Sequence, residues 1–238
     1  MSPVQTEREH RRRHAPTATL DGADLRSAAV HLTTASPRPV PFTLAGAQAR
    51  ADGMSKSALA LVLVASFMVV LDFSIVNVGL PSIRHSLGFG GDSVQWVVTA
   101  YAIAFGGLLI LGGRVGDTFG RRRLFIFGLL VFAFSSLAAG LADHAALLVA
   151  ARAMQGVGAA MVAPASLSLL TARFSEGPRR TRALGWYGAT ASMGYVVGQV
   201  LGGVLVQYTS WRWIFLVNVP VGLAAAALTP RLITSDRP

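Results

Sequence analysis

Two ionisable residues, Asp72 and Arg152, stand inside long apolar stretches of the sequence. Either side chain would cost about 2.5–3.5 kcal/mol if it faced lipid at mid-membrane depth, so we expect each to face an interior cavity or a partner. Asp72 lies about eight residues, or ~12 Å, from the outer end of its stretch, and Arg152 about six residues, or ~9 Å, from the outer end of its own. The two side chains can therefore meet as a proton-linked or substrate-sensing pair. A structural ion pair or a snorkelling arginine is the alternative.

Two amides add polar groups to the same two stretches, Asn77 in the first and Gln155 in the fourth. We expect them to hydrogen-bond neighbouring helices, with contact to a substrate as the alternative. They complete a candidate set of four polar residues for the interior of a membrane bundle.

The fifth apolar stretch carries small residues at a four-residue spacing, which places them on one helix face and allows close helix packing in lipid. These glycines are Gly194, Gly198 and Gly202, and Gly203 follows them. Gln199 stands beside them at mid-membrane depth and needs a polar partner. The alternative is a packing seam with no functional role.

A short basic turn between the second and third stretches forms the third candidate site. Its glycines, among them Gly113 and Gly120, let two helix ends approach closely, and Asp117 can lock against a neighbouring helix. Arg121 and Arg122 follow at its end. The alternative is a merely basic loop on the cytoplasmic side.

The composition supports a membrane protein. Of 238 residues, 53% are hydrophobic and 13% are charged, and the mean hydropathy is +0.53, which is too apolar for an ordinary soluble domain. The arginines behind the net charge of +10 punctuate the apolar stretches, so they indicate topology and argue against a nucleic-acid partner. There is no cysteine, and the five histidines show no metal-ligand spacing. We expect no metal, no cofactor and no enzymatic activity.

Six apolar segments follow a polar region, and each has about the 20 residues needed to cross ~30 Å of hydrocarbon. Residues 1–56 read as a disordered basic cytoplasmic tail without the apolar core of a secretory signal. Translation could instead begin at Met54. The sequence predicts an all-α membrane protein with spans near 57–80, 94–113, 124–142, 146–169, 183–207 and 214–230.

Arginine placement predicts the orientation of these spans. The connections after the second and fourth segments, and the N-terminal tail, are rich in arginine, whereas the opposite connections carry only Arg84 and Arg212. Both termini are therefore expected in the cytoplasm. Pro164 and Pro220 remove backbone donors and are expected to bend the fourth and sixth helices.

Taken together, four motifs resemble those of the major facilitator superfamily, and most closely the N-terminal half of a fourteen-helix drug:proton antiporter. Their order and spacing carry the resemblance more than any one motif does. The sequence departs at Thr118, where the family's loop is usually basic, and at Gln199, where the fifth-helix motif has proline. The four motifs occupy residues 71–81, 113–123, 152–158 and 194–203.

The resemblance implies proton-coupled efflux of small, cationic or amphipathic drugs by alternating access across a bacterial-type plasma membrane. It makes Asp72 and Arg152 the coupling groups and Asp117, with Arg121 and Arg122, the cytoplasmic gate latch. Family members carry a second half, so the implied partners are a second six-helix half, protons, a small-molecule substrate and the lipid bilayer. Two other functions stay open: a carrier of another solute class, such as a sugar or metabolite, and an inactive truncated membrane fragment or interaction partner.

Overall fold

The computed structural model describes residues 54–233 as a bundle of helices, and no strand occurs within that range. Six of its helical segments are long and apolar enough to cross a membrane, which confirms the predicted fold class. Of the expected tail, 1–56, residues 1–53 lie outside the described residues, while Ser55 caps α4 and Lys56 begins it. The helices are α4 (Lys56–Leu87), α5 (Trp96–Phe119), α6 (Arg121–Gly140), α7 (Ala145–Arg173), α8 (Pro178–Tyr208), α9 (Trp213–Leu216) and α10 (Asn218–Leu232), and η1 (Ser93–Gln95) leads into α5.

Most of the spans extend beyond the predicted apolar segments, although α6 ends at Gly140, before the predicted limit of 142. The expected basic turn between the second and third spans is almost entirely helical: α5 continues to Phe119 and α6 begins at Arg121. Gly120 alone joins them, with a φ of 92° that favours glycine. Gly113 lies inside α5 with open space around it, so close approach at this turn does not depend on that glycine.

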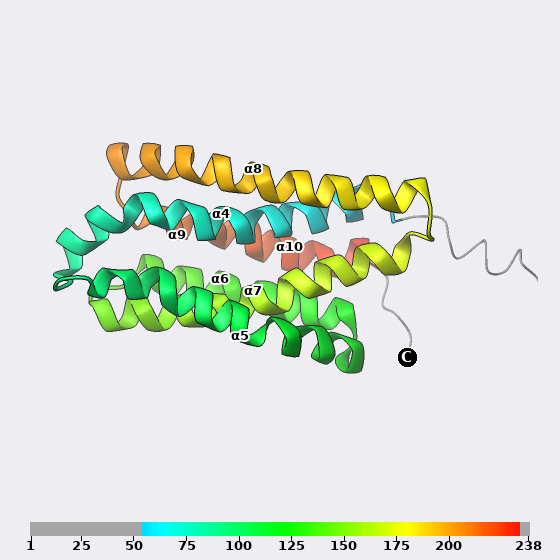
Figure 1. The fold of residues 1–238 in the computed structure, drawn as a ribbon, viewed down its shortest axis with the longest axis horizontal. Coiled ribbons are helices and arrows are strands. Elements are labelled where there is room, and N and C mark those ends of the chain that lie inside the picture. Colours follow the sequence, from blue (N-terminus) through cyan, green and yellow to red (C-terminus); the bar gives the residue numbers. More distant parts are fainter. Residues whose placement is uncertain (1–53, 234–238) are drawn as a thin grey trace, which may run out of the picture. The chain divides into compact units, whose positions relative to one another are not determined.

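Each span packs against one or more neighbours (Figure 1): α4 lies against α8 and α10, α10 against α6, and α7 between α5 and α6. Two glycines of α7 face its two neighbours. A Cβ at Gly156 would lie 2.5 Å from the carbonyl oxygen of Tyr101 on α5, and one at Gly158 would lie 2.7 Å from the nitrogen of Phe132 on α6. Small residues of this kind let helix backbones approach closely in lipid.

Two spans, α5 and α8, flank the bundle and are the most exposed. In the most apolar part of each, 17% of residues are buried, against 61% in α4. Both helices therefore keep a long apolar face that nothing in the described part of the chain covers.

The two prolines behave differently. α7 continues through Pro164 without interruption, whereas the sixth span is interrupted at Val217, three residues before Pro220. Proline lacks a backbone N–H and its ring crowds the carbonyl four residues earlier, here Leu216. Val217 nevertheless keeps helical φ and ψ angles of −61° and −28°, so the bend expected at Pro220 stays a prediction.

Candidate functional site

Asp72 on α4 and Arg152 on α7 meet in the interior of the bundle. Arg152 Nη1 donates to Asp72 Oδ2 at 2.6 Å, and both side chains are fully buried. The depth argument from the sequence placed them within reach of each other, and the structure brings them together. Two opposite charges excluded from water at this distance stabilise each other strongly only if their remaining donors and acceptors are also satisfied.

Amides from two helices satisfy the second carboxylate oxygen. Asp72 Oδ1 accepts from Gln155 Nε2 at 3.0 Å and from Asn218 Nδ2 at 2.8 Å. Gln155 Oε1 in turn accepts from Arg152 Nη1 at 2.9 Å, so Gln155 bridges the two charges. The carboxylate thus receives three donors from α7 and α10.

Ser136 on α6 extends the network to a fourth helix. Its hydroxyl accepts from Gln155 Nε2 at 2.8 Å and donates to the carbonyl oxygen of Phe215 at 3.1 Å. Both protons of the Gln155 amide and both roles of the Ser136 hydroxyl are therefore used. We refer to Asp72, Arg152, Gln155, Asn218 and Ser136 as the interior polar network.

The guanidinium of Arg152 is held on a further side. Its Nε donates to the carbonyl oxygen of Val97 on α5 at 3.0 Å, and its Cζ lies 4.3 Å from the centroid of the Tyr101 ring. A cation over an aromatic face is attracted by the ring's quadrupole. Its second terminal nitrogen, Nη2, has no hydrogen-bond partner among the described residues. The site thus holds a fully buried charge pair whose carboxylate is the ionisable acid of the network.

Asn218, Ser136 and Tyr101 were not singled out in the sequence. Asn218, like Gln155, is a lone amide residue inside an apolar span, so the criterion that selected Gln155 also applies to Asn218. No such criterion selects Ser136 and Tyr101, because serine and tyrosine are common in membrane helices.

Asn77 does not join the network. Its side chain is exposed and donates to the carbonyl oxygens of Phe73 and Ser74 on its own helix. In this chain it therefore lies on a different face of α4 from Asp72.

The glycine stripe of α8 packs directly on α4 beside the network. Gly194, Gly198 and Gly202 are buried, and a Cβ at Gly198 would lie 2.9 Å from the carbonyl oxygen of Leu71. Gln199 finds the partner that it needs, donating to the carbonyl oxygen of Ser74 at 3.4 Å. Ser74 also donates to the carbonyl oxygen of Tyr195 at 2.6 Å.

Gly203 lies at the margin of this seam, since the nearest atom to a Cβ there would be 4.0 Å away, on Val78. The predicted close packing thus depends on three of the four glycines.

The basic turn forms contacts at one end of the bundle. Arg121 Nη2 lies 3.6 Å from Asp117 Oδ1, and its Nη1 donates to the carbonyl oxygen of Ser168 on α7 at 3.5 Å. Arg122 donates to the carbonyl oxygen of Pro230 near the end of α10 at 3.2 Å. These side chains link α5, α6, α7 and α10, although Asp117 itself is 70% exposed.

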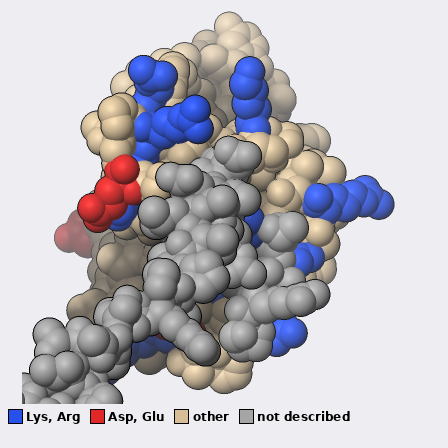
Figure 2. Space-filling model, turned by 90° about the vertical axis from the view of Figure 1, so that its right-hand side faces the viewer, with Lys and Arg blue, Asp and Glu red and all other residues tan. Residues whose placement is uncertain are grey.

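Basic side chains gather around this end of the bundle, with acidic ones at its edge (Figure 2). The arginines lie where α5, α7 and α10 end and where α6 and α8 begin. They are Arg114, Arg121, Arg122, Arg123, Arg173, Arg179, Arg180, Arg182 and Arg231.

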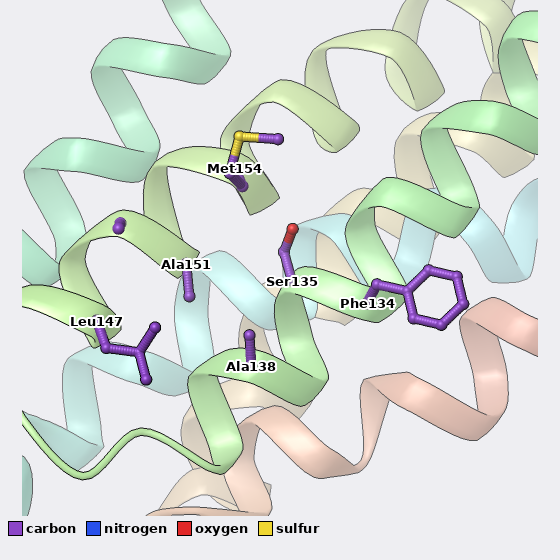
Figure 3. Close-up of a pocket in the computed structure, with 7 residues that line it drawn as sticks. Phe134, Ser135, Ala138, Leu147, Ala151 and Met154 are labelled. Carbon is purple, nitrogen blue, oxygen red and sulfur yellow. The ribbon is translucent and has the colours of Figure 1, made fainter.

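An apolar groove of about 330 Å³ lies between α6 and α7 (Figure 3). Phe134, Ser135 and Ala138 line one side, and Leu147 and Met154 line the other. Neither member of the charge pair lines it, so it is separate from the interior polar network. No group of histidine and acidic side chains that could hold a metal occurs within residues 54–233.

Comparison with known proteins places this arrangement in a family. The model of the Major Facilitator Superfamily matches residues 62–238. The chain is 50% identical over 181 residues to the cephamycin export protein CmcT of Amycolatopsis lactamdurans, covering 76% of this chain and 37% of that protein. It is 50% identical over 179 residues to the puromycin resistance protein pur8 of Streptomyces alboniger, covering 75% of this chain and 35% of that protein.

A third relative, the multidrug resistance protein Stp of Mycobacterium tuberculosis, is 43% identical over 163 residues, which cover 68% of this chain and 30% of that protein. The chain thus spans about a third of the length of these relatives. Six apolar spans, matching motifs in the family's order and a match over most of the chain lead to one conclusion: this multi-pass membrane protein belongs to the major facilitator superfamily.

Proposed function

We propose that this chain is the N-terminal part of a proton-coupled exporter of small amphipathic or cationic drugs that works by alternating access. The observation that carries the proposal is the fully buried Asp72–Arg152 pair with its three-donor carboxylate. Ionisable groups inside spans are expensive and mark ion or substrate pathways by default. The substrate class rests on the relatives, one named for cephamycin export and another for puromycin resistance.

In this proposal Asp72 is the group that takes up and releases the proton. It is the one carboxylate at mid-span depth among residues 54–233. A proton on Asp72 neutralises the charge that holds Arg152 and weakens their hydrogen bond, because charge-assisted bonds are roughly twice as strong as neutral ones. Proton entry supplies ~2.3 kcal/mol per 100 mV of membrane potential. Arg152 and Gln155 then act as the counter-ion and the bridge of this step.

A second six-helix half, either another copy or a separate C-terminal part, completes the transporter. The flanking spans α5 and α8 leave their apolar faces open, and the exposed side chain of Asn77 lies on α4, which packs on α8. In two-part transporters of this architecture the substrate site lies at the interface between the repeats, near the bilayer midplane. We assign Asn77 to the wall of that cavity.

The basic end of the bundle faces the cytoplasm, so both termini of the described helices lie on that side of a bacterial plasma membrane. The arginine excess at this end supports the orientation. Asp117, Arg121 and Arg122 would form a latch that opens when the two halves rock apart. The exposure of Asp117 leaves its carboxylate free to reach a helix of the second half.

The proposal is tested by transport in proteoliposomes that hold this chain together with the C-terminal part of a relative. A cationic dye is the export substrate, and a labelled sugar tests the other solute class. Asp72→Asn should abolish proton-driven dye efflux, whereas Asp92→Asn, the same change in an exposed loop residue, should leave it intact.

Three results would contradict the proposal. Full dye efflux by Asp72→Asn would remove Asp72 from the coupling step. Sugar transport without dye efflux would establish a carrier of the other class. No transport of either solute, with the two parts shown by crosslinking to be assembled, would favour the inactive fragment or interaction partner.

A further inference from the structure

We propose that Asn218 is a positioning residue that links the charge of Asp72 to the conformation of the interrupted sixth span. The inference takes from the proposed function only that Asp72 changes its charge. It assigns a role to a residue outside the motifs that carry the family resemblance.

The orientation of the Asn218 amide is fixed by its partners. Its nitrogen faces two acceptors, Asp72 Oδ1 at 2.8 Å and the carbonyl oxygen of Ile214 at 3.4 Å. Because a carbonyl oxygen and an ionised carboxylate only accept, the amide nitrogen and not the amide oxygen must point at them. One buried NH₂ group therefore joins the carboxylate on α4 to the backbone of α9.

Asn218 holds the backbone at the point where the sixth span divides into α9 and α10. Pro220 cannot donate to Leu216, and the helix is interrupted at Val217. Freed carbonyls in a membrane must be satisfied by side chains of the same or neighbouring helices. The carbonyl oxygen of Ile214 accepts from Asn218, and that of Phe215 accepts from Ser136, so the network supplies donors to two carbonyls just before the interruption.

The charge of Asp72 therefore bears on this interruption. An ionised carboxylate accepts one proton of the Asn218 amide and so directs the other at the carbonyl oxygen of Ile214, whereas a neutral carboxyl group loses the charge assistance and loosens the amide's hold. Among the described residues, Arg152 on α7 is the charged group facing Asp72, and the Tyr101 ring of α5 stacks on that guanidinium. The neighbouring helices α6, α8 and α10 present the uncharged Ser136, the glycine stripe and Asn218.

A double-mutant cycle on the whole chain in lipid nanodiscs tests the link. Backbone hydrogen exchange of residues 213–219 is compared in the wild type, Asp72→Asn, Asn218→Leu and the double variant. Asp72→Asn imitates the neutral state. Each single change should raise the exchange rate about tenfold, as expected for loss of one hydrogen bond to a charged group. The double variant should exchange no faster than either single variant.

Controls separate positioning from simple destabilisation. Ser166→Ala removes a buried hydroxyl that has no hydrogen-bond partner in the described structure and should leave exchange unchanged. Exchange within α6 should also stay at its wild-type level in every variant. The carbon signal of the Asp72 carboxyl, recorded by NMR, should move in Asn218→Leu and stay in place in Ser166→Ala. If Asn218→Leu does not fold, Asn218→Ala takes its place in the cycle.

The link is overturned if Asp72→Asn leaves exchange at residues 213–219 unchanged, or if the two single effects multiply in the double variant. These readouts do not involve transport. A chain that shows the coupling but no dye efflux with a second half would contradict the proposed function and leave the role of Asn218 standing.

Discussion

The chain uses the same pair of residue types, an aspartate and an arginine, in two opposite settings. In the interior, Asp72 and Arg152 are 2.6 Å apart and fully buried. At the basic end, Asp117 and Arg121 are 3.6 Å apart, with 70% and 34% of their side chains exposed. Water screens the second pair and can replace either partner, whereas nothing replaces a missing partner in the first.

The buried and the exposed ion pair are therefore suited to different functions. A buried pair stores a large penalty for separation, so a proton that neutralises one member changes the energy of the whole interior. An exposed pair exchanges partners at little cost, as a latch must. The effect of a substitution on stability should therefore decrease from the interior of the bundle to its surface.

The largest effect is expected from breaking the interior pair on one side. Arg152→Met leaves the Asp72 carboxylate buried without its counter-ion, and we expect a loss of about 3–5 kcal/mol in the free energy of unfolding. Denaturant titration of the chain in mixed micelles measures it. The double variant Arg152→Met with Asp72→Asn should recover part of the loss, because no unpaired charge remains. If Arg152→Met were as stable as the wild type, the buried ion pair would matter no more for stability than the exposed one.

An intermediate effect is expected at the end of the bundle opposite the basic one, where a half-buried arginine caps α6. Arg212 Nη1 donates to the carbonyl oxygens of Gly140 and Ala142 at the end of α6, at 3.1 and 2.6 Å, and the guanidinium stacks on Trp211. Arg212→Met should cost about 1.5–3 kcal/mol, the range for hydrogen bonds to a charged group. The same titration measures it, with hydrogen exchange expected to rise at the end of α6. Arg212→Lys should recover only part, since lysine lacks the planar fork.

The spans and the interior pair could be predicted because both follow from one rule, that lipid admits few polar groups. The position of Asn77 could not be predicted from depth alone. It lies five residues from Asp72, roughly 140° around a helix of 3.6 residues per turn, and so falls on another face. The partners of Asp72 beyond Arg152 depend on which helices adjoin α4, and a pattern in one sequence does not supply that order.

The helix ends were predicted less well for a related reason. Hydropathy stops at Gly113, but α5 continues to Phe119, because a helix is held by its backbone hydrogen bonds and does not need apolar side chains to continue. The basic turn is thus mostly helix, and its side chains are presented from helix ends. Because Asp117, Arg121 and Arg122 are held by helix ends, their proposed roles in a latch have a rigid support.

A smaller effect on stability is expected at the exposed pair. Asp117→Asn should change the free energy of unfolding by less than about 1 kcal/mol, the usual range for exposed ion pairs. In proteoliposomes with a second half, the same variant should nevertheless lose dye efflux, since the latch role concerns a contact outside this chain. Asp92→Asn, at the opposite end, is the matched control. A stability loss as large as that of Arg152→Met would show that Asp117 is structural.

The smallest effect concerns Asp143, in the connection between α6 and α7, and it appears only in acid. The hydrogen bond from His144 holds the pKa of Asp143 below its ordinary value of 3.8, with its own backbone N–H and the charge of Arg212 acting in the same direction. A lowered pKa in the folded state means that ionised Asp143 adds stability above the unfolded-state pKa and loses it as the pH falls through the folded-state value. The difference in stability between the wild type and Asp143→Asn should therefore be small at neutral pH, shrink as the pH falls below about 4, and vanish below the lower pKa of the folded state. Unfolding curves recorded across that interval measure it, with Asp92→Asn as the control. If the stability difference between the wild type and Asp143→Asn grew in acid, the ionised carboxylate would oppose folding. The idea that charges at the surface have only small, favourable effects on stability would then be wrong.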